Sequence, residues 1–139
     1  MEKLKIGLIG LGQRGAACGM TDGSIGLLGN ILNNSDVLVT ALCDGYDERI
    51  KFAAEKVVAA GQKKPLETRD YNEVLSSGVD AVIVCTSWAS HVEVALAAME
   101  KGIAVAIEVG GTHNLGDMQK LVETYERTKT SFMFLENCC

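Results

Sequence analysis

Glycines, carboxylates and histidines recur in this 139-residue sequence just after its apolar runs. The run Leu4–Ile9 leads directly into the pattern G-x-G-x-x-G at residues 10–15. In such a loop the first glycine permits a tight turn, the second lets the backbone approach a pyrophosphate, and the third lets a helix pack closely. The phosphates would lie on free N–H groups at the helix N-terminus. The alternative is a turn that binds nothing. The predicted contacts from this loop are Gly10, Gly12, Gln13, Arg14 and Gly15.

Asp44 follows the β-branched run Val37–Cys43. An acid at this place can accept hydrogen bonds from the hydroxyls of an adenosine ribose. A 2′-phosphate would be disfavoured there, because like charges about 4 Å apart repel by roughly 4 kcal/mol at an effective dielectric constant near 20. Asp44 therefore predicts NAD rather than NADP, unless it only caps a turn with Gly45. Its separation from Gly15 exceeds the usual spacing of about twenty residues, which we attribute to a glycine-rich insertion around Gly23.

Polar groups also follow two later apolar runs. Small hydroxyl residues, the single tryptophan and a histidine come after residues 80–85, where they can contact the middle of a dinucleotide. These candidates are Thr86, Ser87, Trp88 and His91. Glu108 and His113 follow the run at residues 103–107 and are weak candidates for acid–base chemistry. Glu108 is also a predicted cofactor contact, because a carboxylate followed by two glycines at a strand end suggests close approach of the backbone to a ligand. The alternatives are a packing aromatic for Trp88, a helix residue turned to solvent or to a partner carbonyl for His91, a helix cap or surface residue for His113, and a solvated turn for Glu108.

Strand-like and helix-like segments alternate along the chain. Apolar runs at residues 4–9, 37–43, 66–68, 80–85, 103–107 and 131–135 predict strands, with helical apolar spacing in most of the segments between them. Turn formers at residues 21–24 predict a first helix that is broken in its middle. Asp47 and Asp70 are predicted helix N-caps. The alternation predicts an α/β fold, a doubly wound parallel sheet in the order 3-2-1-4-5-6 with helices on both faces, which is a Rossmann fold.

Charge and composition narrow the partners. The net charge is −5 and the basic residues are scattered, so nucleic acid is not an expected partner. No run approaches the roughly 18 apolar residues of a membrane span, and no signal-peptide pattern precedes the first strand, so we expect a cytoplasmic protein without a membrane partner. The five cysteines include no C-x-x-C spacing, which predicts buried thiols rather than disulfides or a metal site.

The sequence resembles the N-terminal NAD(P)-binding domain of the Gfo/Idh/MocA family, the glucose-fructose oxidoreductase and inositol dehydrogenase group. Residues 5–12, Ala41–Asp44, Thr86 with His91, and Lys101-Gly102 before Glu108 carry the resemblance. It implies one dinucleotide-binding domain over residues 1–139 and hydride transfer at a carbinol of a sugar or polyol. The family's second domain, which contacts the sugar-like substrate and forms the homo-oligomer interface, is absent from this chain. We therefore expect this chain alone to bind NAD weakly and to be inactive.

Two positions depart from that family. Val109 stands where members commonly carry the lysine of a Glu-Lys-Pro motif, and Ser87 replaces the proline of a Thr-Pro turn, so ordinary redox chemistry is in doubt. A narrower resemblance, in residues 132–138 and in Glu108-Val109, is to the NAD-dependent glycosidases of glycoside hydrolase family 109. Those enzymes oxidise the sugar transiently, eliminate the glycoside and add water. Asn137, in that run, is a further predicted cofactor contact. A non-catalytic dinucleotide sensor is the third alternative.

Overall fold

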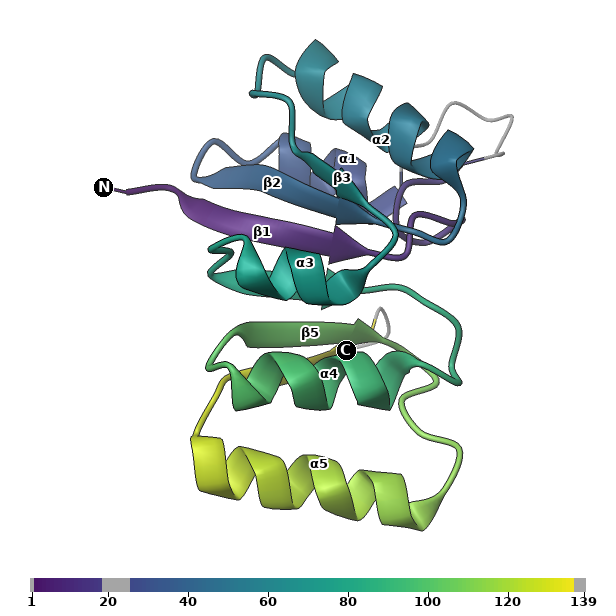
Figure 1. The fold of residues 1–139 in the computed structure, drawn as a ribbon, viewed down its shortest axis with the longest axis vertical. Coiled ribbons are helices and arrows are strands. Elements are labelled where there is room, and N and C mark those ends of the chain that lie inside the picture. Colours follow the sequence, from purple (N-terminus) through teal and green to yellow (C-terminus); the bar gives the residue numbers. More distant parts are fainter. Residues whose placement is uncertain (1, 19–25, 137–139) are drawn as a thin grey trace.

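The computed structural model describes residues 2–18 and 26–136 and arranges them around one six-stranded sheet. The strands are all parallel and lie in the order β3-β2-β1-β4-β5-β6 (Figure 1), as the sequence predicts. In chain order the elements are β1 (Leu4–Ile9), α1 (Gly26–Leu32), β2 (Val37–Cys43), α2 (Asp47–Ala59), β3 (Leu66–Thr68), α3 (Tyr71–Ser76), β4 (Ala81–Val84), α4 (His91–Glu100), β5 (Ala104–Glu108), α5 (Leu115–Thr128) and β6 (Phe132–Leu135).

Helices pack on both faces of the sheet and bury two apolar clusters. On one face α1 and α2 cover β1 and β2 through residues such as Leu28, Leu42 and Val57. On the other face α3, α4 and α5 cover the sheet through residues such as Met99 and Ile107. In Figure 1, α3 and α4 lie in front of the strands and α1 lies behind β2. This arrangement leaves the carboxyl ends of the strands open for a site.

One half of the sheet has a bare face. On one face of the sheet, α1 and α2 cover β1 and β2. Within the described residues, no helix covers β4, β5 and β6 on that same face. A shallow hollow of about 420 Å³ lies there, lined by residues that include Ile83, Ala106 and Met133. Met133 is 56% exposed, although it is an apolar residue in a strand. The domain therefore presents an open apolar surface on the same face of the sheet as α1 and α2, over its other half.

The first helix is interrupted, as the turn formers predict. The Leu27 N–H donates to the carbonyl of Arg14 at 2.9 Å, and the Leu28 N–H donates to the carbonyl of Gly15 at 2.9 Å. In a continuous helix these carbonyls would accept from residues 18 and 19, because helical hydrogen bonds join residues four apart. The helical hydrogen-bond pattern thus continues from the turn after the glycine loop directly into α1, although nine more residues separate the bonded groups in sequence than in an uninterrupted helix.

This interruption accounts for the long spacing between Gly15 and Asp44. Without the nine extra residues the two would be about twenty residues apart, which is the usual spacing of the dinucleotide fold. Before the interruption only a single turn forms, at residues 13–16, so the helical segment expected there is shorter than predicted. Residues 19–25 lie outside the described part of the chain.

The predicted helix caps are confirmed in part. Asp70 caps α3 by accepting from the Asn72 N–H at 2.8 Å. Asp47 was wrongly predicted as a cap, because α2 begins at Asp47 itself and Tyr46 occupies the cap position without a side-chain bond. The Asp47 carboxylate instead accepts two hydrogen bonds from Arg69, both at 2.6 Å. A long arginine after β3 reaches this carboxylate and keeps it away from the helix N–H groups.

Three cysteines lie in the described part of the chain and are free thiols; Cys43 is buried, as predicted, whereas Cys18 and Cys85 are only half-buried. Burial raises the pKa of Cys43 and of Cys85 to about 12, so both stay protonated and are poor nucleophiles at neutral pH. Among the described residues, no group of His, Cys, Asp and Glu could hold a metal ion. No helix in that part of the chain is long and apolar enough to cross a bilayer.

Candidate functional site

A crevice opens at the carboxyl ends of β1 and β4, where the strand order reverses. It encloses about 730 Å³ and is lined by the glycine loop, the end of β2 and the segment after β4. Doubly wound sheets bind their ligands at such a switch point. The predicted residues that the structure brings together here are Gly10, Gly12, Gln13, Arg14, Asp44, Thr86 and Ser87.

The three glycines of the loop differ in what surrounds them. Gly10 has a φ of +92°, and a Cβ there would collide with the backbone of Cys85. A Cβ at Gly15 would collide with the carbonyl oxygen of Gly10. At Gly12 the nearest atom to a Cβ would be Nη1 of Arg49, at an ordinary 3.6 Å. The fold therefore requires Gly10 and Gly15, whereas Gly12 leaves space in the crevice, as a pyrophosphate cradle would need.

Asp44 ties the glycine loop to the end of β2. Its side chain is buried, and Oδ2 accepts from the Leu11 N–H at 2.7 Å. Oδ1 accepts from the Tyr46 N–H at 3.0 Å and lies 3.7 Å from Nη1 of Arg49. The bond to Tyr46 caps the turn at Gly45, which was the alternative role of Asp44. The same carboxylate thus both caps this turn and binds the glycine loop through Leu11. Because a carboxylate has about four acceptor positions, Asp44 keeps capacity for a ribose hydroxyl.

A second hollow of about 320 Å³ adjoins the crevice and shares Arg14, Cys85 and Thr86 with it. Glu108 lies in its wall, is only 5% exposed, and is the last residue of β5. Its Oε1 accepts from Arg14 Nη2 at 2.8 Å and from Nε at 3.2 Å. The hydrogen bond and charge of Glu108 raise the pKa of Arg14 above its ordinary value. Glu108 is therefore a buried ion-pair partner rather than a solvated turn residue.

His91 holds an unsatisfied hydrogen-bond acceptor beside the second hollow. The side chain is 1% exposed, and Nε2 lies 3.0 Å from the Thr86 carbonyl oxygen. A carbonyl can only accept, so Nε2 carries the proton and Nδ1 is the free acceptor of the neutral ring. Nδ1 has no partner among the described residues. Buried polar atoms without partners are uncommon in folded proteins, and a bound ligand is one way of satisfying them.

This burial predicts a pH dependence of stability. Burial lowers the pKa of His91 below its ordinary 6.5, outweighing the hydrogen bond to Thr86 and the charge of Glu108. The unfolded chain therefore takes up a proton that the folded chain refuses, and stability falls as the pH drops through 6.5 towards the lower folded pKa. We expect a lower urea midpoint at pH 5.5 than at pH 7.5, and a smaller difference in His91→Gln. His113→Gln, at an exposed position, is the matched control and should keep the parent's difference.

Trp88 lies at the second hollow, and His113 lies beside Trp88 outside it. Trp88 is 58% exposed, lines this hollow and covers Gly110, where a Cβ would collide with the indole ring. The His113 ring centroid is 6.2 Å from that of Trp88, but His113 is exposed and does not line either hollow. Its position gives acid–base chemistry at the crevice no support. Asn137, the remaining predicted contact, lies outside the described residues.

Sequence reasoning missed the side chains at the Asp44 end of the crevice. They are two aromatic rings and two guanidinium groups, Tyr46, Arg49, Arg69 and Tyr71. Two of them come within five residues of Asp44, directly after β2. Polar and aromatic residues so close to a predicted ribose-binding acid were the available signal. Tyr46 and Arg49 also lie at the start of a predicted helix, and a place in that helix already accounted for them.

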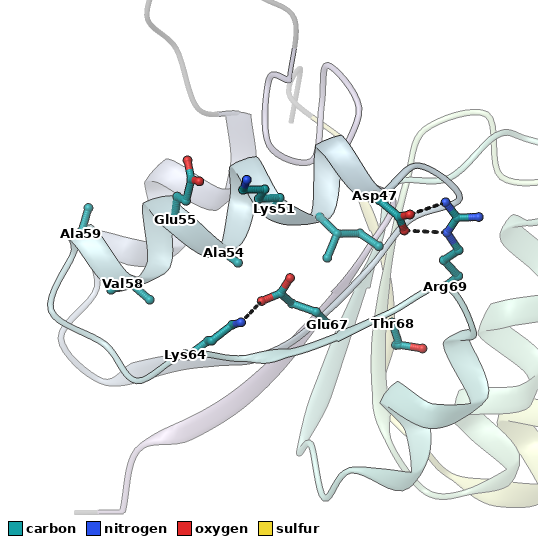
Figure 2. Close-up of a pocket in the computed structure, with 11 residues that line it drawn as sticks. Asp47, Lys51, Ala54, Glu55, Val58, Ala59, Lys64, Glu67, Thr68 and Arg69 are labelled. Atoms are coloured by element: carbon teal, nitrogen blue, oxygen red, sulfur yellow. Dashed lines mark hydrogen bonds and ion pairs between the residues drawn. The ribbon is translucent and has the colours of Figure 1, made fainter.

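Another hollow, of about 850 Å³, lies between α2 and β3, outside the switch point. Figure 2 shows two ion pairs at its edges. Lys64 and Glu67 are joined at 2.9 Å, and Arg69 and Asp47 at 2.6 Å. Only β3 among the strands contributes residues to it, so it brings no strand-end carboxylate or glycine loop together. We therefore place the candidate site in the crevice and not here.

Known sequences match nearly the whole chain. Residues 4–135 match the family model GFO_IDH_MocA, described as an oxidoreductase family with an NAD-binding Rossmann fold. A protein of Streptomyces niveus named glycosyl hydrolase family 109 protein is 39% identical over 97% of this chain and 26% of its own length. A protein of the same family name from Phocaeicola vulgatus is 32% identical over 98% of this chain and 32% of its own length. The chain thus spans about a third or less of these relatives.

Solved structures share the fold. An NAD-binding protein from Listeria innocua is 25% identical with a TM-score of 0.78, over 99% of this chain and 36% of that one. An oxidoreductase from Agrobacterium radiobacter, solved with NAD⁺, L-tartaric acid and magnesium, has a TM-score of 0.80 at 20% identity, over 97% of this chain and 36% of that one. These structures share the fold, and the family match over residues 4–135 identifies the chain as an NAD-binding Rossmann domain of the Gfo/Idh/MocA oxidoreductase family.

Proposed function

We propose that this domain holds NAD for hydride transfer at a carbinol carbon of a sugar or polyol. The observation that carries the proposal is the crevice at the switch point, which Gly12, Arg14 and Asp44 all line and where a Cβ on Gly12 would meet only the Arg49 side chain, at 3.6 Å. NAD, when bound, supplies the hydride acceptor. The residues of this chain bind it, orient it and exclude water from its reactive end.

Each region of the site has a role in this proposal. Gly12 and Arg14 receive the pyrophosphate, and Thr86 and Ser87 contact the middle of the cofactor. Asp44 accepts from the adenosine ribose and disfavours a 2′-phosphate, so NAD is preferred over NADP. The second hollow takes the nicotinamide end, as its position at the end of β5 and the open acceptor of His91 support. The proposed contacts there are Trp88, His91 and Glu108, with Asn137 as a further contact predicted from sequence.

The substrate and its proton transfer belong to the longer protein. Val109 lies in the wall of the second hollow, and no lysine is among the residues that line it. We therefore propose that the acid–base groups, the contacts to a sugar-like substrate and a homo-oligomer interface come from a domain outside this chain. The domain by itself binds NAD weakly and turns over no substrate.

A second candidate is an NAD-dependent glycosidase, in which the oxidation is transient and is reversed after the glycoside is eliminated. The names of the relatives at 39% and 32% identity support it. In the longer protein, release of aglycone without net change of NADH absorbance would identify the glycosidase. Net NADH formation with a polyol would identify the dehydrogenase. Binding of NAD with neither activity would identify a non-catalytic sensor.

The binding half of the proposal can be tested on this chain. We expect calorimetry to give one site for NAD, NADH and ADP-ribose with a Kd no weaker than about 1 mM, which corresponds to roughly −4 kcal/mol. Trp88 is the single tryptophan, so its fluorescence reports on the nicotinamide end. NADH should quench it more strongly than ADP-ribose, which lacks the nicotinamide. Absence of binding by any of the three at millimolar concentration would contradict the proposal.

A further inference from the structure

Arg49 occupies the junction between the ribose-binding acid and the glycine loop. Its Nη1 is 3.7 Å from Oδ1 of Asp44. The same nitrogen would be the nearest atom to a Cβ at Gly12, at 3.6 Å. The guanidinium therefore lies at the part of the crevice where a cofactor would pass from its pyrophosphate to its adenosine ribose.

The position of Arg49 is fixed and is electrostatically unusual. Its Cζ lies 4.6 Å from the centroid of the Tyr46 ring, a stacking geometry that orients the planar guanidinium. Arg49 is also the third residue of α2, where the helix dipole favours acids and disfavours a cation. Helix stability therefore does not account for an arginine here, whereas its ion pair with Asp44 and its contact with the Tyr46 ring do.

The other arginine at this end of the crevice is committed elsewhere. Arg69 also lines the crevice, but its Nε and Nη2 both donate to the carboxylate of Asp47 at 2.6 Å. Arg49 is therefore the guanidinium that stands beside Asp44. From this geometry we infer that Arg49 sets how strictly the site distinguishes NAD from NADP, because it offsets the charge of Asp44 and gives a 2′-phosphate a cationic partner. The inference rests on the proposed NAD function.

The two charges act in opposite directions on the same ligand group. A phosphate monoester carries about −1.5 to −2 charges at neutral pH, so it would be repelled by Asp44 and attracted by Arg49. Guanidinium groups also match phosphate oxygens in geometry. A site with the acid alone would exclude the 2′-phosphate, and a site with the arginine alone would prefer it. With both, the structure favours a modest preference for the unphosphorylated ribose.

ADP-ribose and 2′-phospho-ADP-ribose test this directly, because they differ only in the phosphate. We expect calorimetry on the parent chain to show that the phosphorylated ligand binds more weakly than ADP-ribose, by a factor of at most about ten. In Arg49→Gln the ratio of the two dissociation constants, which is the gap between the ligands, should increase about a further tenfold. The increase should come entirely from weaker binding of the phosphorylated ligand. Arg49→Lys, which keeps the charge but loses the planar guanidinium, should give a ratio of affinities between those of the parent and Arg49→Gln. Lys51→Gln removes the same charge from α2 at a residue lining the hollow of Figure 2, and should leave the gap unchanged.

Three outcomes separate the possibilities. If Arg49→Gln weakens both ligands by the same factor, Arg49 only supports Asp44 and Tyr46, and the inference is wrong. If the gap does not change in Arg49→Gln, the inference is equally wrong. If the parent binds neither ligand at millimolar concentration, the proposed function fails first. Higher salt should narrow the difference between parent and Arg49→Gln, because the effect is electrostatic.

Discussion

Gly15→Ala should destabilise the domain by about 3 kcal/mol or more, the upper end of the cost of overpacking. The added methyl group would collide with the carbonyl oxygen of Gly10, which is backbone and cannot rotate away. Urea unfolding followed by circular dichroism measures the effect. The matched control is Gly45→Ala, where nothing lies within 4 Å of a new Cβ, and its stability should stay within about 0.5 kcal/mol of the parent. A Gly15→Ala chain as stable as the parent would mean that the loop moves as a unit.

Gly12→Ala separates binding from folding in the same loop. Its Cβ would meet only the Arg49 side chain at an ordinary 3.6 Å, so stability should change by no more than about 0.5 kcal/mol. The methyl group would nevertheless occupy the space proposed for the pyrophosphate, and affinity for ADP-ribose should fall at least about tenfold, or 1.4 kcal/mol. Unchanged affinity in a folded Gly12→Ala chain would place the pyrophosphate elsewhere.

Arg14→Leu should weaken both stability and binding. Breaking a fully buried ion pair costs about 3–5 kcal/mol, and we expect about 1–2 kcal/mol here because the Arg14 side chain is 51% exposed and water reaches the site. Affinity for ADP-ribose should fall about tenfold or more, since the crevice loses a cation beside the proposed pyrophosphate. The control is Arg127→Leu, which breaks an exposed pair with Glu100 and should cost no more than about 1 kcal/mol.

Glu108→Gln isolates the acidic half of the same pair. The amide oxygen can still accept from Arg14, so the fold should be retained, while the second hollow, which shares Arg14 with the crevice, loses a negative charge. We expect ADP-ribose to bind a few-fold more tightly, because phosphates are then less strongly repelled. If ADP-ribose binding instead weakens as much as in Arg14→Leu, the charge of Glu108 is needed to hold Arg14 in its binding orientation.

The sheet could be predicted from sequence because its signals are local. Buried parallel strands give continuous apolar runs, as at Val37–Cys43, and even the three-residue β3 has the predicted bounds. Gly10, Gly12 and Asp44 could be placed at one crevice because strand order fixes which strand ends meet. The prediction used only the alternation of strands and helices and the residues that follow each strand.

Pairings between distant side chains could not be predicted. The bonds of Arg14 to Glu108 and of Asp47 to Arg69 join residues 94 and 22 positions apart, and no local pattern selects them among many possible charge pairs. The unsatisfied acceptor of His91 could not be predicted for the same reason, because it depends on which residues distant in sequence pack against the imidazole ring. The proposed role of Arg49 was also hidden, because it depends on the distance between its guanidinium and the Asp44 carboxylate.

The interrupted first helix bears on how members of this fold are recognised. A search that counts residues along the chain from the glycine loop to the acid after β2 would reject this sequence. A search that counts turns along the hydrogen-bonded ladder, from Gly15 through Leu28, would accept it. The geometry that a dinucleotide meets is set by that second count, so chain length can vary between the loop and α1 without moving the acid.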